Sequence, residues 1–239
     1  MAASSSCSKP PSRLGPLGDS ISDLKLLRVS GTELEVVNAA RVSLGVHRET
    51  LDPDRDVKLI RYLARNKHTS PFEHVTMSFR VKCPLFVARQ WMRHRMASYN
   101  EVSGRYTEVK EEYYTPTAWR RQAKSNRQVG DEEFHNQDLV NEFEVAVEDA
   151  FETYHRLLKN GVCREQARMV LPQCTYTEFY FSCNLLSLLN FLRLRLSSDA
   201  QWEIRVYAEE ILRITEPLFP HTFRAWGITK AVTFQEEDA

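Results

Sequence analysis

The chain has 239 residues, of which 42% are hydrophobic and 27% are charged, a composition typical of a globular protein with one large or two small domains. Its 32 Lys and Arg residues balance its 32 Asp and Glu residues, which argues against a general nucleic-acid binder, because such proteins normally carry a basic domain. No apolar run reaches transmembrane length, since the longest, Leu185 to Leu196, is interrupted by Asn190, Arg193 and Arg195.

The five cysteines show no CxxC spacing and predict reduced, mostly buried thiols of a cytoplasmic protein, without a metal site. Residues 1–20 are rich in Ser, Pro and Gly and lack an apolar stretch long enough for a secretory signal. They predict a flexible tail, with an organelle transit peptide as the alternative. Residues 21–230 contain no repeat and no Pro/Gly linker and predict one domain, followed by an acidic tail at 231–239.

Apolar periodicity and capping residues predict the elements of the first half. Residues 24–30 are expected to form a strand, and Thr32 is expected to cap the helix that follows it. Asp52-Pro53-Asp54 is a start signal for a helix over 52–66, because an acid caps and a proline fits the first turn. His74 to Lys82 alternates apolar and polar residues and predicts a half-buried strand.

Pro84 ends this strand and opens a helix through Met92. Tyr106 to Tyr113 could form another strand, and the polar stretch 119–138 predicts a mobile loop or an exposed helix. The remaining elements are helices at 139–159, 163–170, 184–196 and 200–219 and a strand at 173–183. Together these elements predict an α+β protein in which several helices cover a few strands.

The segment from Arg89 to Arg105, RQWMRHRMASYNEVSGR, concentrates arginines and His94 against a single acid, Glu101. In a neutral protein such a cluster is best suited to holding a phosphate or another oxyanion at close range. On a continuous helix Gln90, Arg93 and His94 would share one face, at i, i+3 and i+4. A solvated helix face is the alternative.

The following segment, residues 98–106, is expected to be a loop that wraps a ligand. Ser103-Gly104 lets backbone amides approach a phosphate, Arg105 can close on it, and Glu101 can accept a hydrogen bond from a ribose or base. A plain surface turn is the alternative. Residues 68–74, HTSPFEH, predict a turn in which Ser70 and Glu73 could touch a cofactor, because the proline prevents the alignment of metal ligands.

Two absences narrow the chemistry. No two glycines form a GxG pair, so any nucleotide cofactor must be held by side chains rather than by a glycine-rich turn. No Ser or Cys lies in an activated setting, which argues against a covalent enzyme intermediate.

The apolar helix predicted at 184–196 carries three polar residues. Asn184 and Arg195 are expected to point one way and Asn190 another, a pattern that sites shared between subunits would explain. Backbone-satisfied amides within the core are the alternative for Asn190.

Several motifs together resemble one known family, the flavin-dependent thymidylate synthases, from about residue 20 to 226. They are HTSPFEH at 68–74, FVARQWMRHRMASYNEVSGRY at 86–106 with its RHR-x7-S pattern, REQARMVLP at 164–172, and NFLRLR with AQWEI at 190–204. The resemblance implies the ThyX-like fold, with a small, mostly antiparallel sheet covered by helices and a flavin held without a Rossmann motif. It also implies a homotetramer whose active sites lie at subunit junctions and bind FAD, dUMP and a folate.

The implied reaction converts dUMP to dTMP. The methylene comes from 5,10-methylenetetrahydrofolate and the hydride from reduced FAD, NADPH reduces the flavin, and tetrahydrofolate is released. The partners implied are small molecules, with no nucleic acid and no membrane.

The resemblance also implies site residues. Those implied for dUMP are Gln90, Trp91, Met92, Arg93, Glu101, Val102, Ser103, Gly104, Arg105, Arg168 and Arg195. Those implied for FAD are Ser70, Arg93, His94, Arg95, Glu101, Asn184, Leu185, Leu186 and Asn190. Ser103, Arg105 and Arg168 would hold the phosphate, and Arg195 is the catalytic candidate, because a guanidinium beside the uracil can stabilise developing negative charge.

Two positions differ from the family pattern. Ser70 stands where Thr is frequent, which keeps the hydroxyl, and Asp199 stands where His is common, which would change the electrostatics beside the flavin. Two rival functions follow from the same residues. One is a single-strand nucleic-acid module that stacks bases on Trp91, Tyr99 and Tyr106, and the other is a different flavoprotein reductase of the same fold.

Overall fold

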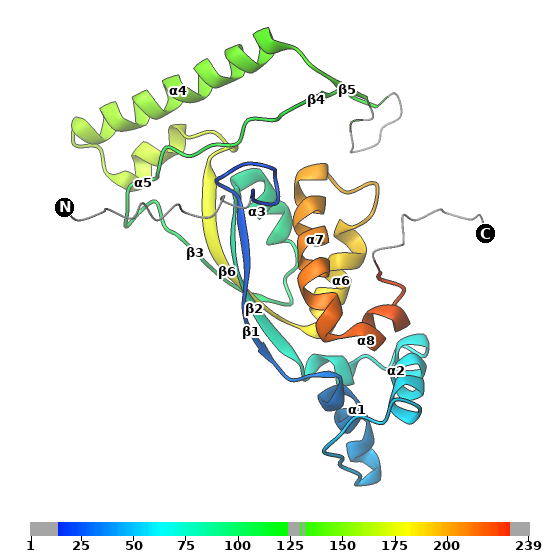
Figure 1. Ribbon diagram of the computed structural model, residues 1–239. Helices are drawn as coiled ribbons and strands as arrows, with labels where there is room; N and C mark the ends of the chain where they lie inside the picture. The colour runs from blue at the N-terminus through cyan, green and yellow to red at the C-terminus, as the bar shows by residue number, and fades with distance from the viewer. Residues whose placement is uncertain (1–13, 124–129, 131, 230–239) are drawn as a thin grey trace, which may run out of the picture.

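The computed structural model describes residues 14–123, 130 and 132–229 and is built around one antiparallel sheet (Figure 1). Its strands, in spatial order, are β1 (Asp23–Ser30), β2 (Thr76–Pro84), β6 (Tyr176–Asn184) and β3 (Ser98–Glu101). β2 and β6 pair along their whole length, from Thr76 opposite Asn184 to Pro84 opposite Tyr176. The predicted α+β class with an antiparallel sheet is confirmed.

One face of the sheet forms the main core. The predicted alternation in β2 is confirmed, because Met77, Phe79 and Val81 are buried while the intervening Ser78 and Arg80 are half-buried on the opposite face. The core face is covered by α3 (Leu85–Trp91), α6 (Leu185–Arg195) and α7 (Trp202–Thr215), as Figure 1 shows. Burial of large aromatic side chains beneath these helices supplies much of the stabilising apolar contact.

At one end of the sheet lie α1 (Glu33–Arg41), α2 (Arg55–Arg65), α8 (Pro220–Ala225) and the 3-10 turns η1 (Val42–Leu44), η2 (Ser70–Glu73) and η4 (Glu216–Leu218). The predicted caps are confirmed here. The Thr32 hydroxyl accepts from the Leu34 backbone N–H in a capping box with Glu35. The Asp52 carboxylate accepts from the backbone N–H groups of Asp54 and Arg55.

At the other end lie α4 (Gln137–Lys159), α5 (Arg164–Ala167) and the turn η3 (Arg168–Val170) (Figure 1). They enclose a smaller apolar cluster of Val147, Phe151, Tyr154, Ala167 and Cys174. α4 ends as predicted at Asn160-Gly161, where Gly161 adopts a left-handed φ of 84° that closes the helix.

Three predicted segments differ from the structure. Residues 98–101, expected in a loop, form the edge strand β3, because β6 offers its free edge to them. Residues 106–113, expected as a strand, contribute only an isolated bridge from Tyr113 to Thr175. The described part of the polar stretch 119–138 contains the short pair β4 (Trp119–Arg120) and β5 (Glu133–Phe134) and the start of α4, whereas residues 124–129 and 131 lie outside the described residues.

Residues 1–13 of the expected flexible N-terminal tail and the expected acidic tail at 231–239 lie outside the described residues. The prediction is wrong for residues 14–20, because Leu17 is buried in the main core and Asp19 accepts a hydrogen bond from the Tyr176 hydroxyl. None of the helices in the described ranges is both long enough and apolar enough to span a bilayer.

Candidate functional site

The arginine cluster begins where α3 leaves the core. α3 ends at Trp91, whose carbonyl accepts from the His94 backbone N–H at 3.0 Å. The Tyr99 hydroxyl of β3 donates to the carbonyls of Trp91 and His94, which fixes a tight reversal of the chain. The prediction that Gln90, Arg93 and His94 share a helix face is therefore wrong, because the last two lie beyond the helix.

Arg195, in the last turn of α6, is held by two groups of this reversal. Its Nε donates to His94 Nε2 at 3.0 Å, and a terminal nitrogen donates to the Gln90 carbonyl at 3.0 Å. The Gln90 side-chain amide donates in turn to Gln201 Oε1 at 2.5 Å. The structure thus brings three predicted site residues together and adds Gln201, which sequence reasoning missed although it lies in the quoted AQWEI motif.

The electrostatics of this group keep His94 neutral. Burial, and secondarily the neighbouring Arg195 charge, lower the pKa of His94 to about 4. A neutral His94 can accept the Arg195 hydrogen bond at Nε2 only if its ring proton is on Nδ1. Burial, and then the Arg93 charge, lower the pKa of Arg195 itself, although guanidinium remains the cation throughout the physiological range.

Residues implied for the flavin line a cavity of about 170 Å³ next to this group. They are His94, Arg95, Asn184, Leu186 and Asn190, with Glu73 beside them. Ser70 is exposed at the start of η2 and does not line this cavity, and Leu185 is fully buried in the core, which leaves only its backbone for a ligand.

The prediction that Asn184 and Asn190 point in different directions is wrong, because both line this cavity. Asn184 is the N-cap of α6, and its side-chain oxygen accepts from the Ser187 backbone N–H at 2.8 Å. It therefore precedes the helix, and helical rotation does not set its direction.

A second group of predicted residues lies at the far end of β3. Glu101, Val102, Gly104 and Arg168 line a cavity of about 350 Å³. The Glu101 carboxylate accepts from the Thr177 hydroxyl at 2.6 Å, a contact that sequence reasoning did not anticipate. The hydroxyl of Thr177 thus orients the Glu101 carboxylate at the end of β3, where the loop begins.

Gly104 is required here for space. A Cβ at this position would lie 3.2 Å from Arg168 Cδ and 2.9 Å from Val109 Cγ2. Because Gly104 has no side chain, the aliphatic stem of Arg168 can pack against the loop. Arg168 as a whole remains exposed. Ser103 begins a turn, because its carbonyl accepts from the backbone N–H groups of Tyr106 and Thr107.

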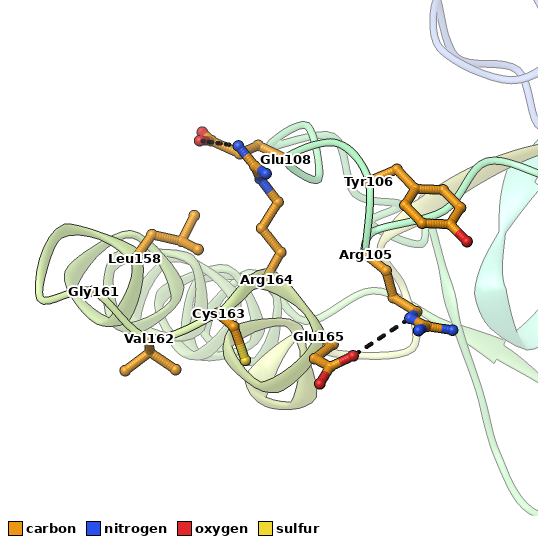
Figure 2. Close-up of a pocket in the computed structure, with 9 residues that line it drawn as sticks. All are labelled: Arg105, Tyr106, Glu108, Leu158, Gly161, Val162, Cys163, Arg164 and Glu165. Atoms are coloured by element: carbon orange, nitrogen blue, oxygen red, sulfur yellow. Dashed lines mark ion pairs between the residues drawn. The ribbon is translucent and has the colours of Figure 1, made fainter.

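Arg105 lies on the outer side of this turn and lines a third cavity of about 420 Å³ (Figure 2). Its Nε is 3.5 Å from Glu165 Oε2 of α5, and its guanidinium lies 5.9 Å from the centre of the Tyr106 ring. Both partners in the ion pair are more than half exposed.

Within one chain the two groups of residues are separated. The cavities of about 170 and 350 Å³ share no lining residue. Ala97 lines the first and Glu101 the second, and the strand residues between their Cα atoms span about 13 Å. The two groups of predicted residues therefore line separate cavities of one chain.

The remaining predicted residues differ in accessibility. Trp91 is fully buried against Phe179, Phe181, Phe191 and Tyr207, so only its backbone can face a ligand. Met92 is half-buried, and Arg93 is exposed.

Two of the three aromatic rings proposed for stacking nucleic-acid bases are not free to do so. Trp91 is in the core and Tyr99 stacks on Phe181, which leaves only Tyr106, 81% exposed. Bases could therefore stack on only one of the three proposed rings.

The donor set fits a flavin nucleotide in part. Amides, a neutral imidazole and guanidinium groups suit the polar edges and phosphates of such a cofactor. A cavity of about 170 Å³ is nevertheless smaller than the roughly 300–1,000 Å³ of cofactor sites, so it can enclose only part of such a cofactor. Burial raises the pKa of the Cys183 thiol to about 12 and also raises that of Cys83, so neither is a nucleophile at neutral pH.

Arginines and amide-lined cavities beside a small antiparallel sheet are features that suit a protein acting on an anionic nucleotide with a polar cofactor. Comparison with known proteins identifies the family. Residues 25–221 match the family model Thy1, described as thymidylate synthase complementing protein. The chain belongs to this family.

Relatives with established names agree. A flavin-dependent thymidylate synthase of Thermus thermophilus is 46% identical over 89% of this chain and 79% of its own length. One from Thermosipho africanus is 45% identical over 85% of this chain and 90% of its own length. Among solved structures, the UMP/dUMP methylase PolB from Streptomyces cacaoi, bound with 5-Br dUMP, has a TM-score of 0.79 and 38% identity over 89% of this chain and 97% of its own.

Proposed function

We propose that this protein is a flavin-dependent thymidylate synthase that converts dUMP to dTMP. The observation that carries the proposal is the fixed guanidinium of Arg195, which is held by the Gln90 carbonyl and by His94, a residue that lines the amide-containing cavity. The names of the relatives and the dUMP methylase neighbour support the same reaction.

In this reaction 5,10-methylenetetrahydrofolate donates the methylene carbon, NADPH is the reductant, and tetrahydrofolate and NADP⁺ are released. FAD, when bound, supplies the hydride that completes the methyl group. The polypeptide needs no nucleophile for this chemistry, in keeping with the buried, inert thiols of Cys83 and Cys183. Its task is to bind, orient and stabilise charge.

We assign the phosphate of dUMP to Ser103, Arg105 and Arg168, at the turn where Gly104 leaves room for the Arg168 stem. Arg195 is the catalytic residue, because a guanidinium beside the uracil stabilises the negative charge that develops as carbon 5 becomes nucleophilic. Its two fixed hydrogen bonds reduce the reorganisation needed when that charge appears.

We assign the flavin to His94, Arg95, Asn184, Leu186 and Asn190, which line one cavity. Glu101 and Ser70 do not line it in the same chain and would contact the flavin of another subunit. We further propose a homotetramer with sites at subunit junctions, which the separation of the two groups of residues along β3 supports. We expect the protein to work in the cytoplasm.

The test is turnover by the purified full-length protein. We expect a yellow protein that forms dTMP from dUMP only when methylenetetrahydrofolate and NADPH are both present. UMP in place of dUMP tests whether the sugar is discriminated, and omission of the folate is the control for background reduction. A colourless protein that takes up no FAD and forms no dTMP would contradict the proposal.

A further inference from the structure

Two ion pairs tie the turn after β3 to the corner between α4 and α5 (Figure 2). Arg105 on the turn faces Glu165 on α5, with Nε and Oε2 3.5 Å apart. Glu108 on the turn faces Arg164 on α5, with Oε1 and a terminal nitrogen 3.8 Å apart. All four residues line the cavity of about 420 Å³, so the two pairs bridge a gap rather than a packed interface.

The Arg105 side chain depends on its ion pair for orientation. It is 54% exposed, and the ring of Tyr106, 5.9 Å away, is itself 81% exposed and holds it only weakly. An arginine that is not packed loses considerable conformational freedom when it binds a ligand. A carboxylate that holds the guanidinium beforehand reduces that loss.

Glu165 could either orient Arg105 for a phosphate or compete with the phosphate for it, and the atom that it contacts bears on this choice. Glu165 Oε2 lies 3.5 Å from Nε, on the stem side of the Arg105 guanidinium. The two terminal nitrogens of Arg105 can donate the parallel hydrogen bonds that bind a phosphate. A phosphate therefore does not need to displace Glu165, and repulsion between the two anions is screened because Glu165 is 56% exposed.

We propose that Glu165 is a positioning residue that orients Arg105 toward the phosphate of the nucleotide substrate. The proposal rests on the proposed function, because it takes Arg105 as a phosphate ligand. Glu165 itself touches no substrate. It determines how well a nucleoside monophosphate binds and leaves the rate of the chemical step unchanged.

The chain offers matched variants at this corner. Glu165→Ala removes the contact, whereas Glu165→Gln keeps an oxygen that can accept from Arg105 Nε and removes only the charge. Arg164→Ala breaks the neighbouring pair between the same turn and the same corner without touching Arg105. Its effect measures the general cost of loosening the corner.

The experiment measures KM and kcat for dUMP with the full-length, flavin-loaded protein. We expect Glu165→Ala to raise KM about three- to five-fold, the upper range for an exposed ion pair, with kcat unchanged. Glu165→Gln should restore most of the affinity, and Arg164→Ala should stay within about two-fold of wild type. Binding of deoxyuridine, which lacks the phosphate, should be the same in wild type and Glu165→Ala.

The outcomes separate this inference from the proposed function. A lower KM in both Glu165 variants would mean that the carboxylate competes with the phosphate and would overturn the inference. An unchanged KM, or an equal loss in Arg164→Ala or with deoxyuridine, would also overturn it. If instead Arg105→Ala binds dUMP as wild type does, or wild type binds no dUMP, the assignment of the phosphate site itself fails.

Discussion

Arg195 and Arg105 are both assigned to the nucleotide, but they lie in separate regions of one chain and their surroundings differ. Arg195 is half-buried and hydrogen-bonded to His94 and to the Gln90 carbonyl, over the aromatic core beneath α3 and α6. Arg105 is more than half exposed on a turn and faces Glu165 across an open cavity. The first is positioned by the core and the second by a surface ion pair.

The two arginines are therefore suited to different tasks, charge stabilisation and phosphate binding. A group that must stabilise charge as it develops gains from a rigid, partly desolvated position, because it then needs no reorganisation during the reaction. A group that binds a phosphate from solution can remain mobile and accessible. The predictions below test the two regions against each other.

The largest expected effect is on stability, at Trp91. Trp91→Ala should lower the free energy of unfolding by about 3–5 kcal/mol, because the fully buried ring leaves a large cavity in the core. Tyr106→Ala, on the exposed turn, should change it by less than about 0.5 kcal/mol. Chemical denaturation of the two variants beside wild type measures both. Equal costs would contradict the division into core and surface regions.

Next comes the effect of Arg195 on turnover. Arg195→Ala should reduce kcat by about 10²-fold or more, the loss expected for one preorganised charge stabiliser, while the circular dichroism spectrum is retained. Arg168→Ala, in the other region, should act mainly on KM for dUMP, because it removes a phosphate contact. Steady-state kinetics separates the two, and an unchanged kcat in Arg195→Ala would refute the role of Arg195.

A smaller effect is expected from the cap of α6. Asn184→Ala removes the side-chain oxygen that accepts from Ser187 and should cost about 1 kcal/mol of stability. Asn190→Ala lacks this capping role and is the matched control on the same cavity. If both asparagines hold the flavin, both variants should release it more easily, but in the flavin-free protein only Asn184→Ala should melt at a lower temperature.

The smallest effect is a dependence on pH through His94. Its pKa is about 4 in the folded protein, below the ordinary value near 6.5, so the unfolded chain binds the proton first as the pH falls. This contribution to stability is complete above about pH 6.5 and is lost between there and about pH 4. An NMR titration should show His94 neutral at pH 6, with its proton on Nδ1. A pKa near 6.5 would mean that burial and Arg195 do not act as described.

Local signals in the sequence predicted much of the fold. The Thr32 and Asp52 caps, the alternation in β2 and the end of α4 at Asn160-Gly161 depend on neighbouring residues, and all are confirmed. The chain reversal after α3 and the strand β3 were missed because each depends on residues that are not neighbours in the sequence. Tyr99 reaches back to the Trp91 carbonyl, and β6 supplies the edge on which β3 forms.

The sequence predicted which residues belong to the site better than it predicted how they are arranged in space. Motif resemblance supplied Arg195, His94 and Gln90, which the structure brings into hydrogen-bond contact. It gave no indication that β3 separates them from Gly104 and Arg168, nor that Gln201 contacts Gln90. Such contacts join residues far apart in the chain, and no spacing rule encodes them.

If these arginines bind a pyrimidine monophosphate beside a flavin, an optical titration will detect it. Adding dUMP to the purified, flavin-loaded protein should shift the flavin absorbance spectrum saturably, and the shift should be lost or weakened in Arg168→Ala. A flavin spectrum that does not respond to dUMP at any concentration would contradict the account.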